Sequence, residues 1–452
     1  MSKLKKVFSK TPPPHPTLFF KKLTPAVVSP SPSPTYFFQT FPNLKINVNF
    51  TLDNHTKSAI IEAGGGKKMN IFEELYPTFK LDKNKKVRLI TLFSGYDSQA
   101  LAFKYLDKEI EHYKAVEFDK FALQSLNEIH NTKFKVLDIK SVNGNDLNIV
   151  DKSKYQYIMT YSFPCTDLSI AGKMQGMEEG SNTRSSLLWE VKRLLNETEE
   201  LPDVLIMENV PQVLTAKGWY QWNVFLEKKG YSNYTQVLDA QNFGIPQQRE
   251  RVFMVSILGD YNYSFPKKIK LESKLKDFLE NEVDDKYFLS AKMIEGKNTK
   301  FSSYQYNNNN NMTDKKIIKT LTTSNGERTP LFIEVKDKGN YFEWQEKGKL
   351  DKDCRYYKEN CIAPTITTTN VGKTLLKDLR IRRLTPKECF RLMGVKPSDY
   401  SKITCSDTQK YKQAGNSIVT TCLMAIYSQL YENCDYTYYI KRLVNDLQQK
   451  EL

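Results

Sequence analysis

The sequence has few of the residues that build metal sites and disulfide frameworks. It contains four histidines in 452 residues, and its seven cysteines form no CxxC pair. Zinc sites are usually built from closely spaced cysteine and histidine ligands, so we predict no metal site. Scattered cysteines are typical of a reducing compartment, and we expect the protein in the cytoplasm.

Long apolar runs are also absent. None reaches the roughly 20 residues that cross a bilayer, so we expect no membrane partner. The chain nevertheless has 40% hydrophobic residues, enough to bury a sizeable core, and its 452 residues allow two or three domains. The composition therefore indicates a globular protein.

Acidic residues are scarce relative to lysine and arginine, and the formal net charge is +15. Such an excess favours a polyanionic partner, because lysine and arginine displace counterions from phosphates. Residues 1–68 alone contribute +8, from ten lysines against Asp53 and Glu62. An AT-rich coding genome, which enriches lysine, is the alternative explanation, so charge alone does not identify the partner.

Residues 1–68 lack a helical or strand period, because proline–serine repeats and the glycines at 64–66 interrupt it. We predict a disordered basic extension there. Two alternatives remain open. The segment could be an organelle transit sequence, although it has no arginine, or the native protein could start at Met69.

From Val87 onward, apolar strand-like runs alternate with helical patterns. The predicted strands are 87–93, 113–118, 134–137, 157–161, 204–207, 235–238 and 251–257, and the predicted helices are 99–106, 185–195 and 219–228. This alternation indicates an α/β fold with a mainly parallel sheet and helices on both faces. Ligands of such sheets gather at the carboxyl ends of the strands.

Chemically reactive side chains stand at the ends of these predicted strands. They are Cys165 after Pro164, the carboxyl group of Glu208, and the guanidiniums of Arg249 and Arg251. A nucleophile, an acid and two guanidiniums at one sheet edge can form a covalent site for a polar planar ring. Singly, each has a plainer interpretation, respectively a buried cysteine, an exposed glutamate and a phosphate-binding patch.

The first strand is followed by the turn Phe93-Ser94-Gly95. Backbone N–H groups in a turn that leads into a helix suit an adenosyl ligand. One glycine is a weak signal, and an ordinary turn with Asp97 or Ser98 as the helix N-cap is the alternative.

In this order the motifs resemble those of the DNA cytosine-5 methyltransferases. The resemblance runs from about residue 87 to residue 420, and it rests on Leu92–Gly95, Pro164–Cys165, Glu208–Val210, Gln247–Arg251, Arg383–Pro386 and Gln413–Ser417. It implies a Rossmann-like S-adenosylmethionine-dependent methyltransferase fold with a second, smaller target-recognition domain. The implied division is a catalytic and cofactor-binding domain at 86–258, a target-recognition domain at 259–375, and a C-terminal segment, 376–452, that completes the catalytic domain.

The resemblance also implies roles. Cys165 would add to carbon 6 of cytosine, and Glu208 would act as the acid at the adjacent ring nitrogen, where burial would favour its protonated form. Arg249 is expected to reach the base carbonyl, with Arg251 as a brace. Because the target base must leave the duplex, the loop 169–184 is predicted to close over it.

For the cofactor, S-adenosyl-L-methionine, the resemblance implies Glu117 at the ribose hydroxyls, Phe118 against the adenine and Asp138 at its amino group. Asn416 would supply a polar contact and would also cap a helix beginning at Ser417. The rest of the expected set is Phe93, Ser94, Gly95 and Pro164.

The sequence departs from the family pattern in the cofactor loop. The family has an aspartate where Thr91 stands and glycines where Asp97 and Ser98 stand. Further along, Thr385 and Pro386 predict the N-cap and first position of a scaffold helix.

We therefore predict a monomeric enzyme that methylates cytosine carbon 5 in a short sequence of double-stranded DNA. The family suggests the modification half of a bacterial or phage restriction-modification system, with a cognate restriction endonuclease. One alternative is a tRNA cytosine-5 methyltransferase with the same core, and the long insert between Arg251 and Arg383 favours DNA over it. Another is a non-catalytic DNA-binding scaffold, against which the presence of Cys165 and Glu208 argues.

Overall fold

The computed structural model describes residues 76–164, 177–180, 183–288 and 383–449, together with short strands outside these ranges. The chain divides into two compact units, one of residues 1–53 and 58–69 and one of residues 54–57 and 70–452. The first unit holds short strands that form two small sheets, with β1 (Thr35–Phe37) paired to β2 (Asn49–Thr51) and β3 (Ile60–Ala63) paired to β4 (Lys67–Asn70). The rest of residues 1–68 lies outside the described residues, so the disorder predicted for this whole segment stays a prediction.

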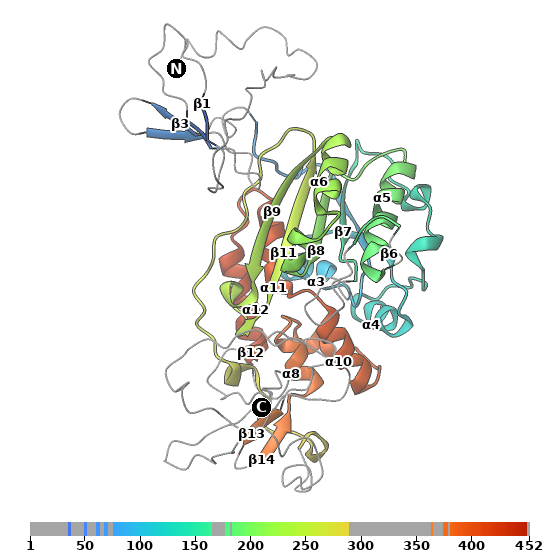
Figure 1. Ribbon diagram of the computed structural model, residues 1–452. Coiled ribbons are helices and arrows are strands. Elements are labelled where there is room, and N and C mark those ends of the chain that lie inside the picture. Colours follow the sequence, from blue (N-terminus) through green and yellow to red (C-terminus); the bar gives the residue numbers. More distant parts are fainter. Residues whose placement is uncertain are drawn as a thin grey trace, which may run out of the picture. The chain divides into compact units, whose positions relative to one another are not determined.

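The second unit is built on a six-stranded sheet (Figure 1). Its strands, in spatial order, are β6 (Glu111–Val116), β5 (Lys86–Leu92), β7 (Tyr155–Tyr161), β8 (Val204–Asn209), β11 (Glu250–Leu258) and β9 (Tyr231–Asp239). The first four are parallel to one another, and β11 runs antiparallel to both of its neighbours. The predicted, mainly parallel sheet is thus confirmed.

The longer helices follow the strands along the chain. They are α3 (Ser98–Tyr105), α4 (Lys120–His130), α5 (Leu188–Glu197), α6 (Trp219–Lys228), α8 (Pro386–Arg391), α9 (Pro397–Tyr400), α10 (Asp407–Asn416), α11 (Thr420–Ser428) and α12 (Tyr436–Gln448). Short 3-10 helices are η1 (Ile139–Ser141), η2 (Gly144–Leu147), η3 (Arg184–Leu187), η4 (Pro211–Thr215), η5 (Ala240–Phe243), η6 (Leu275–Phe278) and η7 (Asp285–Tyr287). As predicted, Thr385 caps α8, where its hydroxyl accepts from the Glu388 N–H and Pro386 takes the first position.

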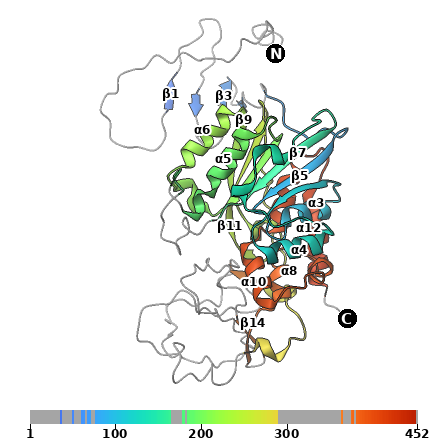
Figure 2. The same ribbon diagram turned by 90° about the vertical axis from the view of Figure 1, so that its right-hand side faces the viewer.

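Alternate residues of each central strand enter two separate apolar layers. In β8, Val204 and Ile206 belong to one layer, and Leu205 and Met207 to the other. This follows from the period of two in a strand. Helices α3, α11 and α12 cover the first face and α5 and α6 the second, and Figure 2 shows the sheet between these layers.

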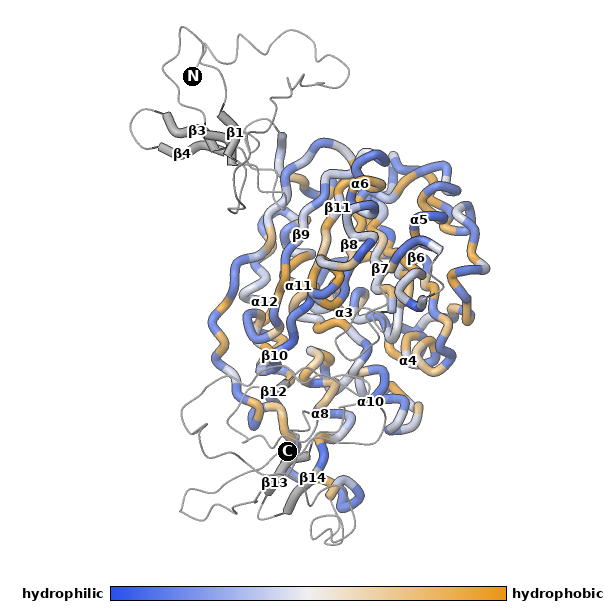
Figure 3. Tube along the Cα trace, viewed as in Figure 1, coloured by the Kyte–Doolittle hydropathy of each residue, from blue (hydrophilic) through white to orange (hydrophobic). Residues whose placement is uncertain are grey.

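Segments distant in sequence complete the first layer. Leu275 and Phe278, which follow the last strand of the sheet, share it with residues of α8, α11 and α12. All nine residues of α11 are buried, and the central strands and this helix form the hydrophobic interior of Figure 3. Each fully buried aliphatic or phenylalanine side chain stabilises the fold by roughly 1.5–3 kcal/mol. The domain boundaries assigned from the sequence stay predictions.

Two further pairs of short strands lie outside the six-stranded sheet. β10 (Gln247–Gln248) pairs in parallel with β12 (Ala363–Pro364), and β13 (Thr374–Lys377) pairs antiparallel with β14 (Arg380–Arg383). Residues 289–373 of the predicted target-recognition domain lie outside the described residues, apart from β12.

Two local predictions are wrong. Residues 134–137 form no strand. Among the described residues they make a single ladder-like bond, from the Leu137 N–H to the Glu117 carbonyl, and Val136 and Leu137 are 48% and 40% exposed. Asn416 is the last residue of α10 and caps no helix at Ser417, since the next helix begins at Thr420 after Val419.

Candidate active site

Two of the catalytic residues predicted from the sequence, Glu208 and Arg251, lie together at one edge of the sheet. The parallel strands β5, β7 and β8 all end there, and β11 begins there because it runs in the opposite direction. In register, Phe253 lies opposite Glu208 and Val252 opposite Asn209. At this edge, the strands that follow β5 along the chain lie on opposite sides of it, β6 on one side and β7 on the other. Open α/β sheets bind ligands at such a switch point.

Glu208 and Arg251 form an ion pair at this edge. Arg251 Nε lies 3.2 Å from Glu208 Oε1, and Glu208 is 7% exposed. The burial expected for this glutamate is confirmed. Because a buried carboxyl group needs a polar partner, the Arg251 guanidinium both satisfies Glu208 and fixes its orientation.

Arg249 faces different partners. It is 3% exposed, its backbone N–H donates to Asp239 Oδ1 (3.0 Å), and its Nη2 donates to the carbonyls of Gly415 (3.1 Å) and Ser417 (2.7 Å). This guanidinium therefore ties the start of β11 to the C-terminal segment. The sequence motif at 413–417 gave no direct sign of this contact.

The segment that leads to Cys165 is held from two sides. Asn209 Nδ2 donates to the Phe163 carbonyl (3.0 Å), and the Ser185 hydroxyl donates to the Pro164 carbonyl (2.8 Å). Cys165 itself lies outside the described residues. The chain thus enters that position immediately beside the Glu208–Asn209 strand end.

Most of the predicted mobile loop, 169–184, also lies outside the described residues. Of its described part, Met177 is fully buried, and its carbonyl accepts from Trp189 Nε1 (2.7 Å). Glu179 pairs with Lys192 (2.8 Å). These contacts attach the described part of the loop to α5.

The turn after β5 has an unusual backbone. Phe93, Gly95 and Asp97 all have left-handed φ values, of 57°, 59° and 62°. For residues other than glycine this conformation costs about 1–2 kcal/mol each, and such strain is kept where the surrounding contacts determine it. One of those contacts is on the side of β6, where the Gly95 N–H donates to Glu117 Oε2 (2.7 Å).

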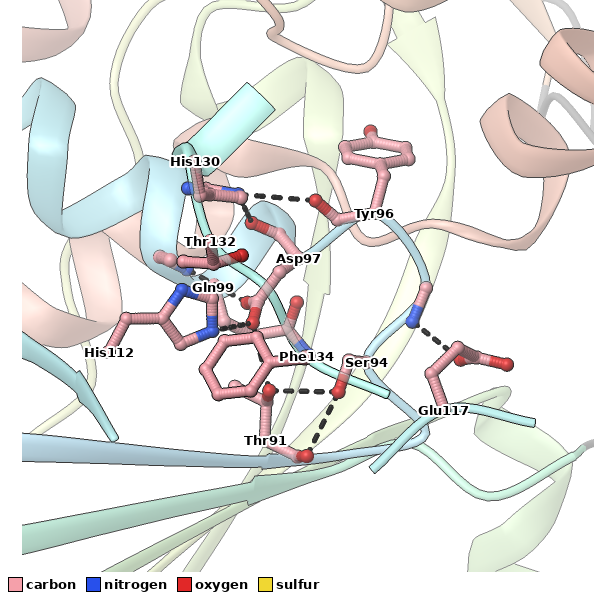
Figure 4. A network of polar contacts seen from close by, with 12 residues as sticks. Thr91, Ser94, Tyr96, Asp97, Gln99, His112, Glu117, His130, Thr132 and Phe134 are labelled. Atoms are coloured by element: carbon pink, nitrogen blue, oxygen red, sulfur yellow. Dashed lines mark hydrogen bonds and ion pairs between the residues drawn. The ribbon is translucent and has the colours of Figure 1, made fainter. Parts of the chain in front are cut away.

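The other contacts come from a buried polar network, drawn in Figure 4. Asp97 caps α3 through the Ala100 N–H, and its carboxylate also accepts from the Thr91 hydroxyl (2.8 Å) and lies 2.7 Å from His112 Nε2. Burial works to raise the pKa of Asp97, but His112 and His130 outweigh it and the pKa lies below its ordinary value. The alternative of Asp97 as an N-cap is confirmed, and its histidine partners are a finding of the structure.

The residues present fit an adenosyl group at this turn. A Cβ at Gly95 would have no atom of the described residues within 4 Å, so within this part of the chain the turn faces open space. Glu117 is partly buried, and burial raises its pKa although the backbone N–H groups of Asp119 and Gly95 act to lower it. Next to it, Phe118 is 71% exposed. A carboxylate and an exposed ring side by side match the ribose and the adenine of such a ligand.

The remaining predicted cofactor residues lie around the same turn with fewer contacts. Asp138 is exposed and uses one oxygen to accept from the Lys140 N–H (3.0 Å). Asn416 is exposed at the end of α10. Tyr96 links the turn to Ser417, the residue after Asn416, since the Tyr96 hydroxyl donates to Ser417 Oγ (2.9 Å). The individual roles of these side chains stay predictions.

Within the described ranges, no three His, Cys, Asp or Glu side chains gather in a way that could hold a metal ion. The helices of those same ranges include none that is both long and apolar enough for a bilayer.

Comparisons with known proteins agree with this arrangement. The model of the family described as C-5 cytosine-specific DNA methylase matches residues 87–432. The type II methyltransferase M2.ScrFI of Lactococcus lactis subsp. cremoris is 33% identical over 331 residues, which cover 71% of this chain and 79% of that protein. The orphan methyltransferase M.SssI of Spiroplasma monobiae is 31% identical over 306 residues, covering 65% and 69%.

A solved structure supports the fold. That of the S. pombe Dnmt2 methyltransferase matches with a TM-score of 0.54 at 18% identity, covering 76% of this chain and 98% of that one. The fold class, the cofactor and the reaction predicted from the motifs are confirmed. The chain belongs to the C-5 cytosine-specific DNA methylases, and it is an S-adenosylmethionine-dependent DNA cytosine-5 methyltransferase.

Proposed function

We propose that Cys165, Glu208 and Arg251 form the catalytic centre at the carboxyl edge of the sheet. The observation that carries this assignment is the Glu208–Arg251 pair, 3.2 Å apart, beside the Asn209 side chain that holds the approach to Cys165. An acid, a cation and a thiol at one edge suit a ring that must be attacked and neutralised together.

In this proposal Cys165 adds as the thiolate to carbon 6 of a cytosine turned out of the duplex. A bond forms between sulfur and carbon 6, and the electron pair of the carbon 5–carbon 6 double bond moves toward ring nitrogen 3. Glu208 holds a proton or hydrogen bond at that nitrogen, which makes carbon 5 nucleophilic. Bound S-adenosylmethionine supplies the electrophilic methyl group. Transfer of the carbon-5 proton to water and return of the nitrogen-3 proton to Glu208 then allow Cys165 to leave as the thiolate, which restores the ring.

The two arginines take different roles in our assignment. From the sequence, Arg249 was expected at the base carbonyl, with Arg251 as a brace. The distances support the reverse, because Arg251 lies beside Glu208 and Arg249 donates to the Gly415 and Ser417 carbonyls. We therefore assign the base contact to Arg251 and the structural brace to Arg249.

For the cofactor we propose the turn Phe93–Gly95 with Glu117 at the ribose. The hydrogen bond from Gly95 to Glu117 supports this, because it joins the carboxylate to the turn that faces open space. We also assign contacts from Phe118, Asp138, Pro164 and Asn416. Residues 259–375 are proposed to read the DNA sequence through base edges.

The biological setting is a further part of the proposal. M2.ScrFI is a type II methyltransferase, which supports a cognate restriction endonuclease that acts on the same site as this enzyme. M.SssI, in contrast, is an orphan methyltransferase. We propose a monomer that acts on DNA in the cytoplasm. Light scattering of the purified chain tests the monomer, and protection of methylated DNA from restriction enzymes tests the setting.

The catalytic assignment is tested with tritiated S-adenosylmethionine and separate DNA and tRNA substrates. We expect label in DNA for the wild-type chain and none for Cys165→Ser. Label in tRNA alone would contradict the DNA assignment. Bisulfite sequencing of the product then identifies the methylated site.

A further inference from the structure

The carboxylate of Asp97 connects three elements behind the cofactor turn. Asp97 is 0% exposed, and Oδ1 accepts from the Ala100 N–H at the start of α3 (3.0 Å). Oδ2 accepts from the Thr91 hydroxyl on β5 (2.8 Å) and lies 2.7 Å from His112 Nε2 on β6. Because a buried carboxylate tolerates few arrangements of its partners, these three contacts fix where residue 97 sits.

His130 holds the same turn from the last residue of α4. Its Nε2 lies 3.2 Å from the Tyr96 carbonyl and 3.1 Å from the Asp97 carbonyl. Both partners are acceptors, so Nε2 carries the proton and donates. The ring also packs edge-on against His112, with centroids 5.2 Å apart. The backbone at 96–97 is therefore fixed at its carbonyls as well as at its side chain.

These contacts lie on the opposite side of the turn from Glu117, as Figure 4 shows. Glu117 accepts from the Gly95 N–H, whereas Asp97, His112 and His130 leave Gly95 untouched. Two of the three left-handed residues of the turn are thus held from opposite sides, Gly95 by Glu117 and Asp97 by the histidine side. The conformation that opens the space at Gly95 is consequently maintained by side chains that do not line that space.

We propose that Asp97, His112 and His130 are positioning residues that preorganise the turn 93–96 for S-adenosylmethionine. The inference rests on the proposed function, in which this turn binds the cofactor. The three side chains act through the backbone and touch neither the cofactor nor the reacting atoms. They increase the affinity for the cofactor, because a turn already held in the binding conformation loses less conformational entropy when the ligand binds.

The geometry also explains two departures of the sequence from the family pattern. The Thr91 hydroxyl lies within 2.8 Å of Asp97 Oδ2, so Asp97 brings a carboxylate from the far end of the turn to the neighbourhood of side chain 91. In the family pattern, an aspartate at position 91 and a glycine at position 97 would place the carboxylate at the same spot, from the strand side of the turn. Glycine at 97 also tolerates the φ of 62°.

This exchange gives a direct test in the full-length chain. D97G removes the carboxylate, and T91D adds a second one next to Asp97, so each single variant should lose S-adenosylhomocysteine affinity by about tenfold or more. The double variant T91D/D97G should recover to within about threefold of the wild type. If the double variant lost as much S-adenosylhomocysteine affinity as the single variants, a carboxylate at position 91 could not replace the one at position 97.

The positioning role is tested by the split between KM and kcat. D97N removes the carboxylate of Asp97, and H112Q keeps that carboxylate but removes its histidine partner. For both variants the KM for S-adenosylmethionine should rise about tenfold, well beyond any fall in kcat. D399N is the matched control. Asp399 is 1% exposed and binds Lys104 (2.6 Å) and Tyr105 (2.9 Å) at the other end of α3, so its loss should lower the melting temperature without changing this KM.

The outcomes separate the inference from the proposed function. If the wild-type chain binds S-adenosylhomocysteine and D97N and H112Q bind it equally well, the positioning role is overturned. The same holds if D399N raises the KM as much as D97N does. If G95A leaves cofactor binding intact, the turn does not bind the cofactor. Both the proposed placement of S-adenosylmethionine at this turn and the positioning role would then be wrong.

Discussion

Arg251 Nε lies 3.2 Å from Glu208 Oε1, across two antiparallel strands whose register places Glu208 opposite Phe253. The pair lies at the point where the parallel strands end and the antiparallel strand begins. This relationship places an acid and a cation together within reach of one planar ring.

Replacing Glu208 with glutamine should abolish most of the activity. The amide cannot transfer a proton to the ring nitrogen, so we expect kcat to fall by about 10²–10⁴-fold while DNA affinity is retained. Single-turnover methylation measures the first quantity and a gel-shift titration the second. Glu250→Gln is the matched control, because Glu250 is exposed at the start of the neighbouring strand β11, and its kcat should stay within about twofold. Comparable rates for the two variants would contradict the role of Glu208.

Replacing Asn209 with alanine should slow catalysis through the segment that leads to Cys165. The change removes the hydrogen bond from Asn209 Nδ2 to the Phe163 carbonyl and leaves that carbonyl unsatisfied, which costs about 1–3 kcal/mol. We expect kcat to fall by about tenfold or more, because a displaced nucleophile reacts slowly. Asn233→Ala, at the opposite end of the sheet, should leave kcat unchanged. Equal effects of both variants on kcat would argue against a positioning role.

Replacing Gly95 with alanine should weaken cofactor binding more than stability. The φ of 59° makes alanine strained by about 1–2 kcal/mol, and its methyl group would enter the open space at the turn. We expect the KM for S-adenosylmethionine to rise about tenfold. Gly230→Ala has the same kind of strain, with φ 89° and ordinary van der Waals contact, at the far end of β9. It should lose similar stability and keep the wild-type KM.

His130 should make the fold sensitive to mild acid. Burial lowers the pKa of His130 to about 4, so between pH 6.5 and 4 the unfolded chain binds a proton that the folded chain excludes. The free energy of unfolding therefore falls as the pH falls, by about 2 kcal/mol between pH 7.5 and 5 from this residue. Urea denaturation at both pH values measures it. His130→Gln keeps an N–H donor and should show a smaller fall, whereas an equal fall would refute the assignment.

The regular parts of the fold could be predicted because their signals are local. The helix predicted at 219–228 is α6, and the alternation of apolar strand-like runs and helical patterns correctly predicted the mainly parallel sheet. At 134–137 the same reasoning failed. The apolar residues Val136 and Leu137 are 48% and 40% exposed, and the Leu137 N–H donates to the carbonyl of Glu117, the residue proposed to bind the ribose. An exposed apolar run has the same local sequence pattern as a buried strand.

The site was predictable where a motif carries its own chemistry and unpredictable where partners come from distant segments. Glu208 is buried as expected, but the alternation of Arg249 and Arg251 did not reveal that one binds Glu208 and the other binds carbonyls at 415 and 417. Likewise, His112 and His130 stand on β6 and α4, and nothing in their local sequence links them to Asp97. Only the tertiary structure brings these groups together.

The most direct test of the mechanism uses a duplex in which the target cytosine carries fluorine at carbon 5. Once methylated, such a base has no proton to lose at that carbon, so the enzyme cannot leave it. With S-adenosylmethionine present, the wild-type chain should form a stable protein–DNA adduct that mass spectrometry maps to Cys165, and Cys165→Ser should form none. An active wild-type enzyme that forms no adduct, or an adduct at another residue, would contradict covalent catalysis by Cys165.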